Sequence, residues 1–316
     1  MKTLVITGII LLFSKSSVSQ KDSSSENSAV QKQLKHYVSA LAHDSMQGRF
    51  TGSTGMYKTA DCIVREIKKI GLQPLNNYNQ YFQQYQINYQ GTALNALNIV
   101  GAIYGDSLKD EIVIICAHYD HIGKSNNRNG EDSVYNGAND NASGVAGILY
   151  LASELIKSKP QRTILFVFFC GEELGLIGSS YFAERINTEK IIAVFNFDMI
   201  GRGNRPFLTG SGYGNMFKFL NNQLYKVSPE IYKKNFFKPE PYKQLPATYF
   251  LRSDNYPFAV KGVPSHTFML TTDSDIHYHQ LTDEVSTLNF EMMSKLLTAV
   301  KLSVSPVIEG RFTPKE

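Results

Sequence analysis

Ile112-Val113-Ile114-Ile115-Cys116-Ala117 is an uninterrupted apolar run that leads directly into His118-Tyr119-Asp120-His121. A run of this kind predicts a strand that is covered on both faces, as in a parallel sheet. Ligands of open α/β sheets bind outside the carboxyl ends of the strands. The polar residues that end this strand are therefore candidates for a functional site.

Similar runs, rich in β-branched residues, occupy 97–103, 163–169, 191–197 and 265–270. Apolar residues recur at helical spacing in 29–42, 56–71, 142–157, 174–184 and 288–302. This alternation predicts an α/β fold: a single three-layer domain with a mostly parallel, mixed central sheet covered by helices on both faces. No internal repeat or break in composition divides the pattern, so we expect one domain over residues 29–316.

Three further segments are expected to connect these elements. Residues 76–89, rich in Tyr, Gln and Asn, should form a loop followed by a strand. Residues 46–55 form a Gly-rich loop whose glycines permit close backbone packing or positive φ. This loop lacks a Gly-Lys-Ser/Thr sequence and a preceding strand, so we do not expect it to bind phosphate. Residues 204–250 should be an insertion that builds a substrate pocket wall, with aromatic residues that suit either apolar substrates or surface packing: Phe207, Tyr213, Tyr249 and Phe250.

The chain opens with a pattern typical of a secretory signal. An apolar run at 4–13 follows Lys2, and small residues then lead to Ser19, after which we expect cleavage. The run is too short to cross a hydrocarbon core about 30 Å thick, so we expect no membrane anchor. The interpretation is a signal peptide over 1–19, a disordered linker over 20–28, and a secreted or periplasmic protein.

The composition excludes several classes of protein. A formal net charge of +4 on 316 residues is too small to indicate a nucleic-acid partner. Three cysteines can form neither a disulfide framework nor a thiolate metal site. We expect Cys116 and Cys170, near the ends of core strands, to be buried free thiols.

Carboxylates follow the other central strands at the same place. The run at 163–169 leads into Glu172 and Glu173, and the run at 191–197 ends at Asp198. The Gly-containing sequence 137–144 adds Asp140 at the start of the helix that returns from this edge. Three consecutive strands thus deliver imidazole or carboxylate groups to one edge of the sheet.

Imidazole and carboxylate donors without cysteine suit Zn²⁺. Some five donors indicate two zinc ions that share a bridging carboxylate, which we expect to be Asp140. Asp120 is placed to accept the second N–H of the His118 ring. Because the side chains of Glu172 and Glu173 diverge, one should bind metal and the other should act as general base.

Each residue also has a purely structural interpretation. A lone histidine after a strand is more often a hydrogen-bonded structural residue, adjacent glutamates often complement a helix dipole, and Asp140 could be an N-cap. The coincidence of these residues at one edge favours a metal site. His36 and His43 lie on or near a polar helix face and are given no functional role.

Five motifs follow one another along the chain: His118-Tyr119-Asp120, the sequence GANDNASG at 137–144, Gly171-Glu172-Glu173-Leu174-Gly175, Asn196-Phe197-Asp198-Met199-Ile200-Gly201 and Tyr278-His279-Gln280. Together they resemble the di-zinc aminopeptidases of clan MH, which includes bacterial leucyl aminopeptidases and glutamate carboxypeptidase. The resemblance runs from about Leu41 to about Asp283, and residues 46–55 look like the family's Gly-rich loop.

The resemblance implies a role for each site residue. His118 and Asp198 would bind one zinc ion. Glu173 and His279 would bind the other, and Asp140 would bridge the two. Glu172 would be the general base, Asp120 would orient His118, and Tyr278 would lie near the developing oxyanion. His277 is a rival for the last ligand, but the order Tyr-His-Gln favours His279, and Ser253-Asp254 would have a structural or substrate-wall role.

These roles imply a secreted zinc-dependent exopeptidase, and most simply an aminopeptidase that acts on peptides with a free N-terminus. One alternative is a single-zinc acyltransferase similar to glutaminyl cyclase, against which the full set of five ligands argues. A second is an inactive binding domain on the same fold, which would be marked by the loss of a ligand. Aminopeptidase, dipeptidase and carboxypeptidase activities share this metal site, so the choice among them rests on the resemblance alone.

Overall fold

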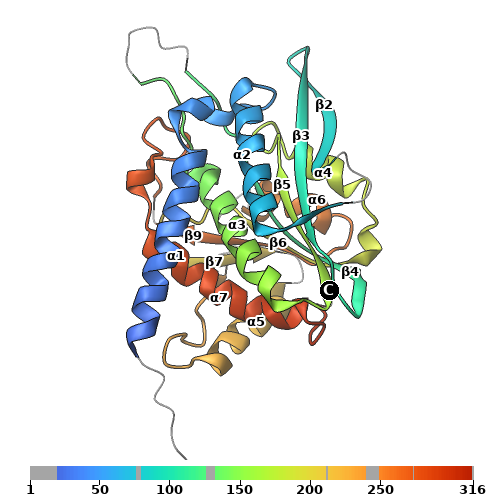
Figure 1. The fold of residues 1–316 in the computed structure, drawn as a ribbon, viewed down its shortest axis with the longest axis vertical. Coiled ribbons are helices and arrows are strands. Elements are labelled where there is room, and N and C mark those ends of the chain that lie inside the picture. Colours follow the sequence, from blue (N-terminus) through green and yellow to red (C-terminus); the bar gives the residue numbers. More distant parts are fainter. Residues whose placement is uncertain are drawn as a thin grey trace, which may run out of the picture.

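A computed structural model describes residues 20–75, 80–125, 132–210, 213–239, 249–272 and 274–314 (Figure 1). Its centre is a nine-stranded sheet in the order β1-β3-β5-β4-β6-β9-β7-β8, with β2 paired to β3. The strands are β1 Gln73–Pro74, β2 Phe82–Tyr89, β3 Thr92–Ile103, β4 Leu108–His118, β5 Arg162–Phe169, β6 Ile191–Phe197, β7 Arg205–Gly210, β8 Lys238–Pro239 and β9 Ser265–Thr271.

The middle of the sheet is parallel and its outer parts are mixed. β4 lies between β5 and β6 and is parallel to both, and β9 continues the parallel set beside β6. β3 and β7 join this set in antiparallel orientation. The mostly parallel, mixed sheet predicted from the sequence is confirmed, and the carboxyl ends of β4, β5 and β6 therefore lie at one edge.

Helices cover both faces of this sheet. The α-helices are α1 Gln20–Leu41, α2 Thr54–Ile70, α3 Gly144–Leu155, α4 Ile177–Ala183, α5 Tyr213–Val227, α6 Tyr256–Ala259 and α7 Phe290–Ile308. Figure 1 shows α1, α2, α3, α5 and α7 on one face, with α4 and α6 on the other. Within the described ranges, no helix combines the length and the apolar character needed to cross a bilayer.

Two separate cores explain why the central strands are apolar without interruption. Along β5, Phe166 and Phe168 belong to the core under α1, α2, α3 and α7, whereas Val167 and Phe169 belong to the core under α4 and α6. Successive side chains of a strand point to opposite faces, so a strand covered twice must be apolar at every position. In this second core Phe169 contacts Phe182, with ring centroids 5.8 Å apart.

The Gly-rich loop packs as its glycines suggested. Gly48 has a φ of +67°, and a Cβ there would lie 1.9 Å from the carbonyl oxygen of Gly123. Gly123 in turn donates its N–H to the Gly48 carbonyl. The loop is thereby fixed against the segment that follows His118 and His121. The next element, α2, begins where Ser53 accepts a hydrogen bond from the Met56 N–H.

The expected disordered linker at 20–28 is wrong, because α1 begins at Gln20. No glycine or proline interrupts residues 20–28, so a helix nucleated by the packed part of α1 can propagate through polar residues. Near this end Ser294 of α7 donates a hydrogen bond to Asn27. Polarity alone therefore did not predict the state of this segment.

The expected insertion at 204–250 is in part a component of the sheet. β7 pairs with β9, and Phe207 and Leu208 are buried. Residues 211–212 and 240–248 of this segment lie outside the described residues, as do residues 76–79 of the other expected loop. All three cysteines are buried free thiols, as we expected for Cys116 and Cys170.

The double covering of the sheet can be tested at its centre. Phe166 is 0% exposed, so Phe166→Ala should lower the free energy of unfolding by roughly 3–5 kcal/mol. Val260→Ala, at a site that is 68% exposed, should change it by no more than about 0.5 kcal/mol. Denaturant unfolding of both variants measures the difference, and equal effects would contradict the assignment of the core.

Candidate active site

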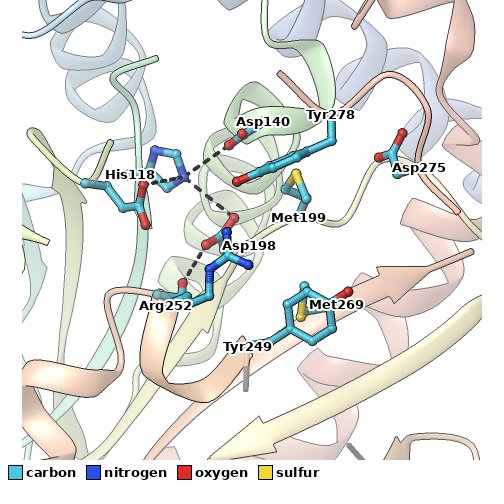
Figure 2. Close-up of a pocket in the computed structure, with 11 residues that line it drawn as sticks. His118, Asp140, Asp198, Met199, Tyr249, Arg252, Met269, Asp275 and Tyr278 are labelled. Carbon is cyan, nitrogen blue, oxygen red and sulfur yellow. Dashed lines mark hydrogen bonds and ion pairs between the residues drawn. The ribbon is translucent and has the colours of Figure 1, made fainter. Parts of the chain in front are cut away.

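The candidate residues meet at the carboxyl edge predicted from the sequence. β4 ends at His118, Glu172 and Glu173 follow β5, and Asp198 follows β6. Asp140 lies in a short turn, Ala138–Ser143, that precedes α3. Tyr278 and His279 come from the loop between β9 and α7. Figure 2 shows His118 between Asp140 and Asp198, with the Tyr278 ring pointing from its loop toward them.

One group of donors surrounds His118. Its Nε2 atom lies 3.4 Å from Asp140 Oδ1 and 3.6 Å from Asp198 Oδ1. Glu172 Oε2 is slightly farther, 3.9 Å from the same nitrogen. Because all these atoms face one point, this group can hold a cation.

A second group surrounds His279. Its Nε2 atom lies 3.1 Å from Asp140 Oδ2 and 3.1 Å from Glu173 Oε2. His121 also contacts this group, with Nδ1 2.7 Å from Glu173 Oε1. Asp140 thus turns one oxygen toward each group, which is the geometry of a bridging carboxylate.

The donor set fits zinc. Both groups contain imidazole nitrogens and carboxylate oxygens. Donor atoms lie within 4.8 Å of one another in the set His121, Asp140, Glu173 and His279, and likewise in the set His118, Glu172 and Asp198. Ligand atoms around a tetrahedral zinc with bonds of about 2.0–2.1 Å are about 3.3 Å apart. The ligand nitrogens of His118 and His279 lie 3.1–3.6 Å from the oxygens of Asp140, Asp198 and Glu173, which is close to this value.

The two adjacent glutamates have opposite electrostatic environments. Burial raises the pKa of Glu172 well above its ordinary value, and the negative charge of Asp198 adds to this effect. Burial and Asp140 also oppose ionisation of Glu173, but hydrogen bonds from His121 and His279 lower the pKa of this carboxyl. A raised pKa suits a proton acceptor, and a lowered pKa suits a metal ligand.

The carboxylates of the site raise the pKa values of two of the neighbouring histidines. Hydrogen bonds to Asp140 and Glu173 raise the pKa of His279 to about 10. Burial opposes protonation of His118, yet the surrounding carboxylates, Glu172 foremost, raise the pKa of His118 well above its ordinary value. Both histidines therefore occupy positions where a cation is stabilised.

Asp120 contacts His118 somewhat differently than expected. The Nδ1 atom of His118 lies 3.2 Å from the Asp120 carbonyl oxygen and 3.7 Å from its carboxylate. The carboxylate instead accepts hydrogen bonds from the Thr51 hydroxyl and from the Glu172 N–H. Asp120 therefore orients His118 chiefly through its backbone and helps to place Glu172 through its side chain.

The rival ligand His277 does not face either group. Its Nδ1 atom lies 2.9 Å from the Thr282 hydroxyl, and its ring lines a different cavity beside Arg202 and Asn289. His279 is thus the histidine of this loop that reaches the site. Ser253, for which we expected a structural or wall role, donates a hydrogen bond of 2.6 Å to Asp198 Oδ2.

A cavity of about 250 Å³ opens onto the first group of donors. Among the described residues of the expected pocket wall at 204–250, Tyr249 lines this cavity. The other lining residues are His118, Asp140, Glu172, Asp198, Met199, Arg252, Ser253, Met269, Asp275 and Tyr278. Phe207, another aromatic residue expected in that wall, packs against the Tyr249 ring. Phe250 packs instead against Tyr256, and the side chain of Tyr213 lies outside the described residues.

Sequence reasoning missed two buried charges that hold the Asp140 turn. The guanidinium of Arg49, only 1% exposed, donates to five carbonyl oxygens, those of Leu41, Tyr119, Asn136, Gly137 and Asp140. From the opposite side, the Asp283 carboxylate accepts the N–H groups of Asn139 and Asp140. His121 was also missed, although it follows the same strand as His118.

The protein has a mixed α/β fold, and paired clusters of imidazole and carboxylate groups lie at the ends of its parallel strands. This combination is typical of the metal-dependent hydrolases to which two-metal aminopeptidases belong. The sequence model of peptidase family M28 matches residues 98–302. The chain therefore belongs to peptidase family M28.

Individual relatives agree with this family. Aminopeptidase YwaD of Bacillus subtilis is 27% identical over 226 residues, which are 69% of this chain and 46% of YwaD. Probable leucine aminopeptidase 2 of Aspergillus oryzae is 27% identical over 178 residues, 49% of this chain and 35% of that protein. The chain thus spans half or less of the length of these relatives.

Solved structures share the fold at low sequence identity. BSAP, a zinc aminopeptidase from Bacillus subtilis, superposes with a TM-score of 0.69 at 17% identity, over 90% of this chain and 97% of that chain. A glutaminyl cyclase from Bacteroides thetaiotaomicron superposes with a TM-score of 0.67 at 16% identity, over 87% and 97%. Because a peptidase and a cyclase are both present, the fold alone does not choose between these activities.

The structure predicts that Arg49 is needed to form the metal site. In Arg49→Lys the charge remains, but an ammonium group cannot reach the five carbonyl oxygens, so the Asp140 turn should loosen. We expect zinc affinity to fall roughly 10–100-fold, as for other groups that support metal ligands. Competition with a chromophoric chelator measures the zinc affinity. Arg65→Lys, on the exposed face of α2, is the control. Equal affinities in the two variants would refute the role of Arg49.

Proposed function

We propose that the protein is a zinc-dependent aminopeptidase that binds two zinc ions and hydrolyses the N-terminal peptide bond of peptides. The observation that carries the proposal is the position of Asp140, whose two carboxylate oxygens face two separate donor groups. His118 and Asp198 would complete one zinc site. Glu173 and His279 would supply the other.

Zinc held by these residues would lower the pKa of a water molecule and polarise the scissile carbonyl. Glu172 is the residue placed to accept a proton from the attacking water, because it lies beside His118 and borders the cavity. The same carboxyl then returns this proton to the leaving nitrogen. Its burial favours this transfer by making it a stronger base than an exposed glutamate.

Tyr278 is placed to stabilise the oxyanion. Its ring stacks on His279 with centroids 4.0 Å apart and lines the cavity. A tyrosine hydroxyl is protonated at neutral pH and can donate a hydrogen bond, and burial raises the pKa of Tyr278 further. A donor fixed at this point gains strength as negative charge develops on the carbonyl oxygen.

Two features of the site favour a peptide chain end as substrate. The cavity of about 250 Å³ lies below the usual volume range of ligand pockets, and so suits one terminal residue. Its wall is rich in carboxylates, which attract a free α-ammonium group. Asp275 in this wall is already paired with Arg202 at 2.9 Å, so the carboxylates at the metal groups are the better partners.

A single-zinc cyclase is the weaker proposal. The second donor group, with Glu173 and His279, would have no function in a site that uses one zinc ion. An inactive binding domain is likewise weaker, since every one of the five expected ligands faces one of the two groups.

Replacing the proposed base tests the function. Glu172→Gln should retain two zinc ions per chain but lose activity on aminoacyl p-nitroanilides by roughly 10²–10⁴-fold or more, because the amide cannot accept a proton. Glu184→Gln, at an exposed position beyond α4, is the matched control. Chelation should abolish wild-type activity, and a metal-free protein that remains fully active would exclude the proposal.

We also propose that residues 1–19 direct secretion and are removed after Ser19. Expression of the sequence from Met1 in a bacterial host should then give a mature protein in the periplasm or medium that begins at Gln20. Mass spectrometry of the purified protein determines its first residue. Retention of Met1 in an active cytoplasmic protein would contradict the proposal.

A further inference from the structure

We propose that the outer edge of β2 is an interface at which two copies of this chain pair, so that their sheets join into one. The strand runs over Phe82–Tyr89 and is 8 residues long. Among the described strands only β3 pairs with it, which leaves its other edge open. Figure 1 shows the β2–β3 hairpin projecting at this end of the sheet.

The backbone of β2 presents hydrogen-bonding groups along this open edge. The N–H of Val100 donates to the Tyr81 carbonyl, so these two residues form a hydrogen-bonded pair just before the strand. Opposite residues of an antiparallel ladder alternate between hydrogen-bonded and non-hydrogen-bonded pairs. The N–H and C=O groups of Gln84, Gln86 and Asn88 therefore point away from β3 and can bind another strand.

The features that usually protect an edge strand are missing from β2. Natural edge strands carry lysine, proline or a bulge, each of which hinders pairing with another chain. Residues 71–105 contain no Asp, Glu, Lys or Arg, although these residues make up 19% of the chain. β2 also contains no proline, and its register with β3 is unbroken from Phe82 to Tyr89. The edge is thus long, regular and uncharged, as pairing between strands requires.

Contacts on its inner face hold β2 in place. The Tyr85 ring stacks on Tyr181 with centroids 4.6 Å apart, and the Tyr85 hydroxyl donates to the Cys170 carbonyl at 2.5 Å. Alternate residues of the strand, from Gln84 to Asn88, are exposed on the other face. Because the strand is already formed and anchored, it loses little conformational entropy when it pairs.

A second copy of the chain is the partner that this edge fits. Two identical uncharged strands can pair antiparallel about a two-fold axis without placing like charges opposite each other. A peptide substrate is a poorer occupant, because none of the described residues that line the active-site cavity belongs to β2. A cavity of about 450 Å³ beside the strand, bounded in part by Tyr57, Gln84 and Gln86, offers further contact to the partner's side chains. Pairing uses the β2 edge of both copies, so it closes as a dimer.

Sedimentation velocity of the purified protein over a range of concentrations measures the pairing. A strand of 8 residues forms a small interface, so we expect a reversible dimer with a dissociation constant on the order of 10 μM. Gln86→Pro removes an N–H that points away from β3, and should raise this constant roughly 10-fold or more, because each dimer loses two hydrogen bonds. Gln86→Lys leaves the backbone intact and should also weaken the dimer, because it adds a charge to the edge.

Gln86→Thr is the matched control, since it keeps the N–H and an uncharged side chain. All three variants lose the side-chain hydrogen bond from Gln86 to Asn95 alike, so that bond does not account for a difference between them.

Hydrogen exchange locates the contact, because the amides of Gln84, Gln86 and Asn88 should exchange more slowly in concentrated than in dilute protein. A wild type that is still monomeric at about 100 μM, well above the expected constant, would overturn the proposal, even if a peptide with the sequence of residues 81–89 binds to it. A dimer of equal stability in all three variants would place the interface elsewhere and would overturn the proposal as well.

Discussion

The active site depends on how the turn that carries Asp140 is held between two buried charges of opposite sign. The Asp140 carbonyl accepts a hydrogen bond from Arg49, and the Asp140 N–H donates to Asp283. A buried charge is costly unless its hydrogen bonds are satisfied, so each of these groups is stable only while the turn keeps its shape. The Asp140 carboxylate, which we propose bridges two zinc ions, is thereby fixed by its own backbone, before any interaction of its side chain is considered. Arg202 completes the arrangement by pairing with Asp283 at 2.9 Å.

The same turn explains why a crowded set of acids can exist at this edge. Carboxylates on three strands would repel one another strongly in a site with little water. In the described part of the chain, three histidines approach these carboxylates, and the shifts in pKa show the result: His118 and His279 hold protons more tightly, and Asp140 loses its proton more readily. An arrangement that stabilises protonated imidazoles is also one that stabilises a metal cation. The electrostatic strain of the site and its affinity for zinc are therefore two consequences of one placement of charge.

The sequence predicted those features that depend on local pattern and failed where a side chain's environment is set by distant residues. The run 112–117 and its neighbours indicated a sheet covered on both faces, because the strand period leaves no other way to bury every residue. His118, Glu173 and Asp198 followed from the rule for the carboxyl ends of strands. Arg49 could not be found in this way, since an arginine in a glycine-rich loop usually lies in solvent, and four of its five acceptors come from two segments distant in the sequence, at Tyr119 and at 136–140. The helix at 20–28 was missed because its polar composition gave no sign of the packed helix that it extends.

His121 illustrates the same limit within a single motif. In the sequence it is one of two histidines separated by two residues, and nothing in that spacing assigns them to different donor groups. The chain leaves the sheet at His118, so the direction of the next side chains depends on the turn at 119–123 and on its contacts with Gly48 and Gly137. Those contacts send His118 toward Asp198 and His121 toward Glu173.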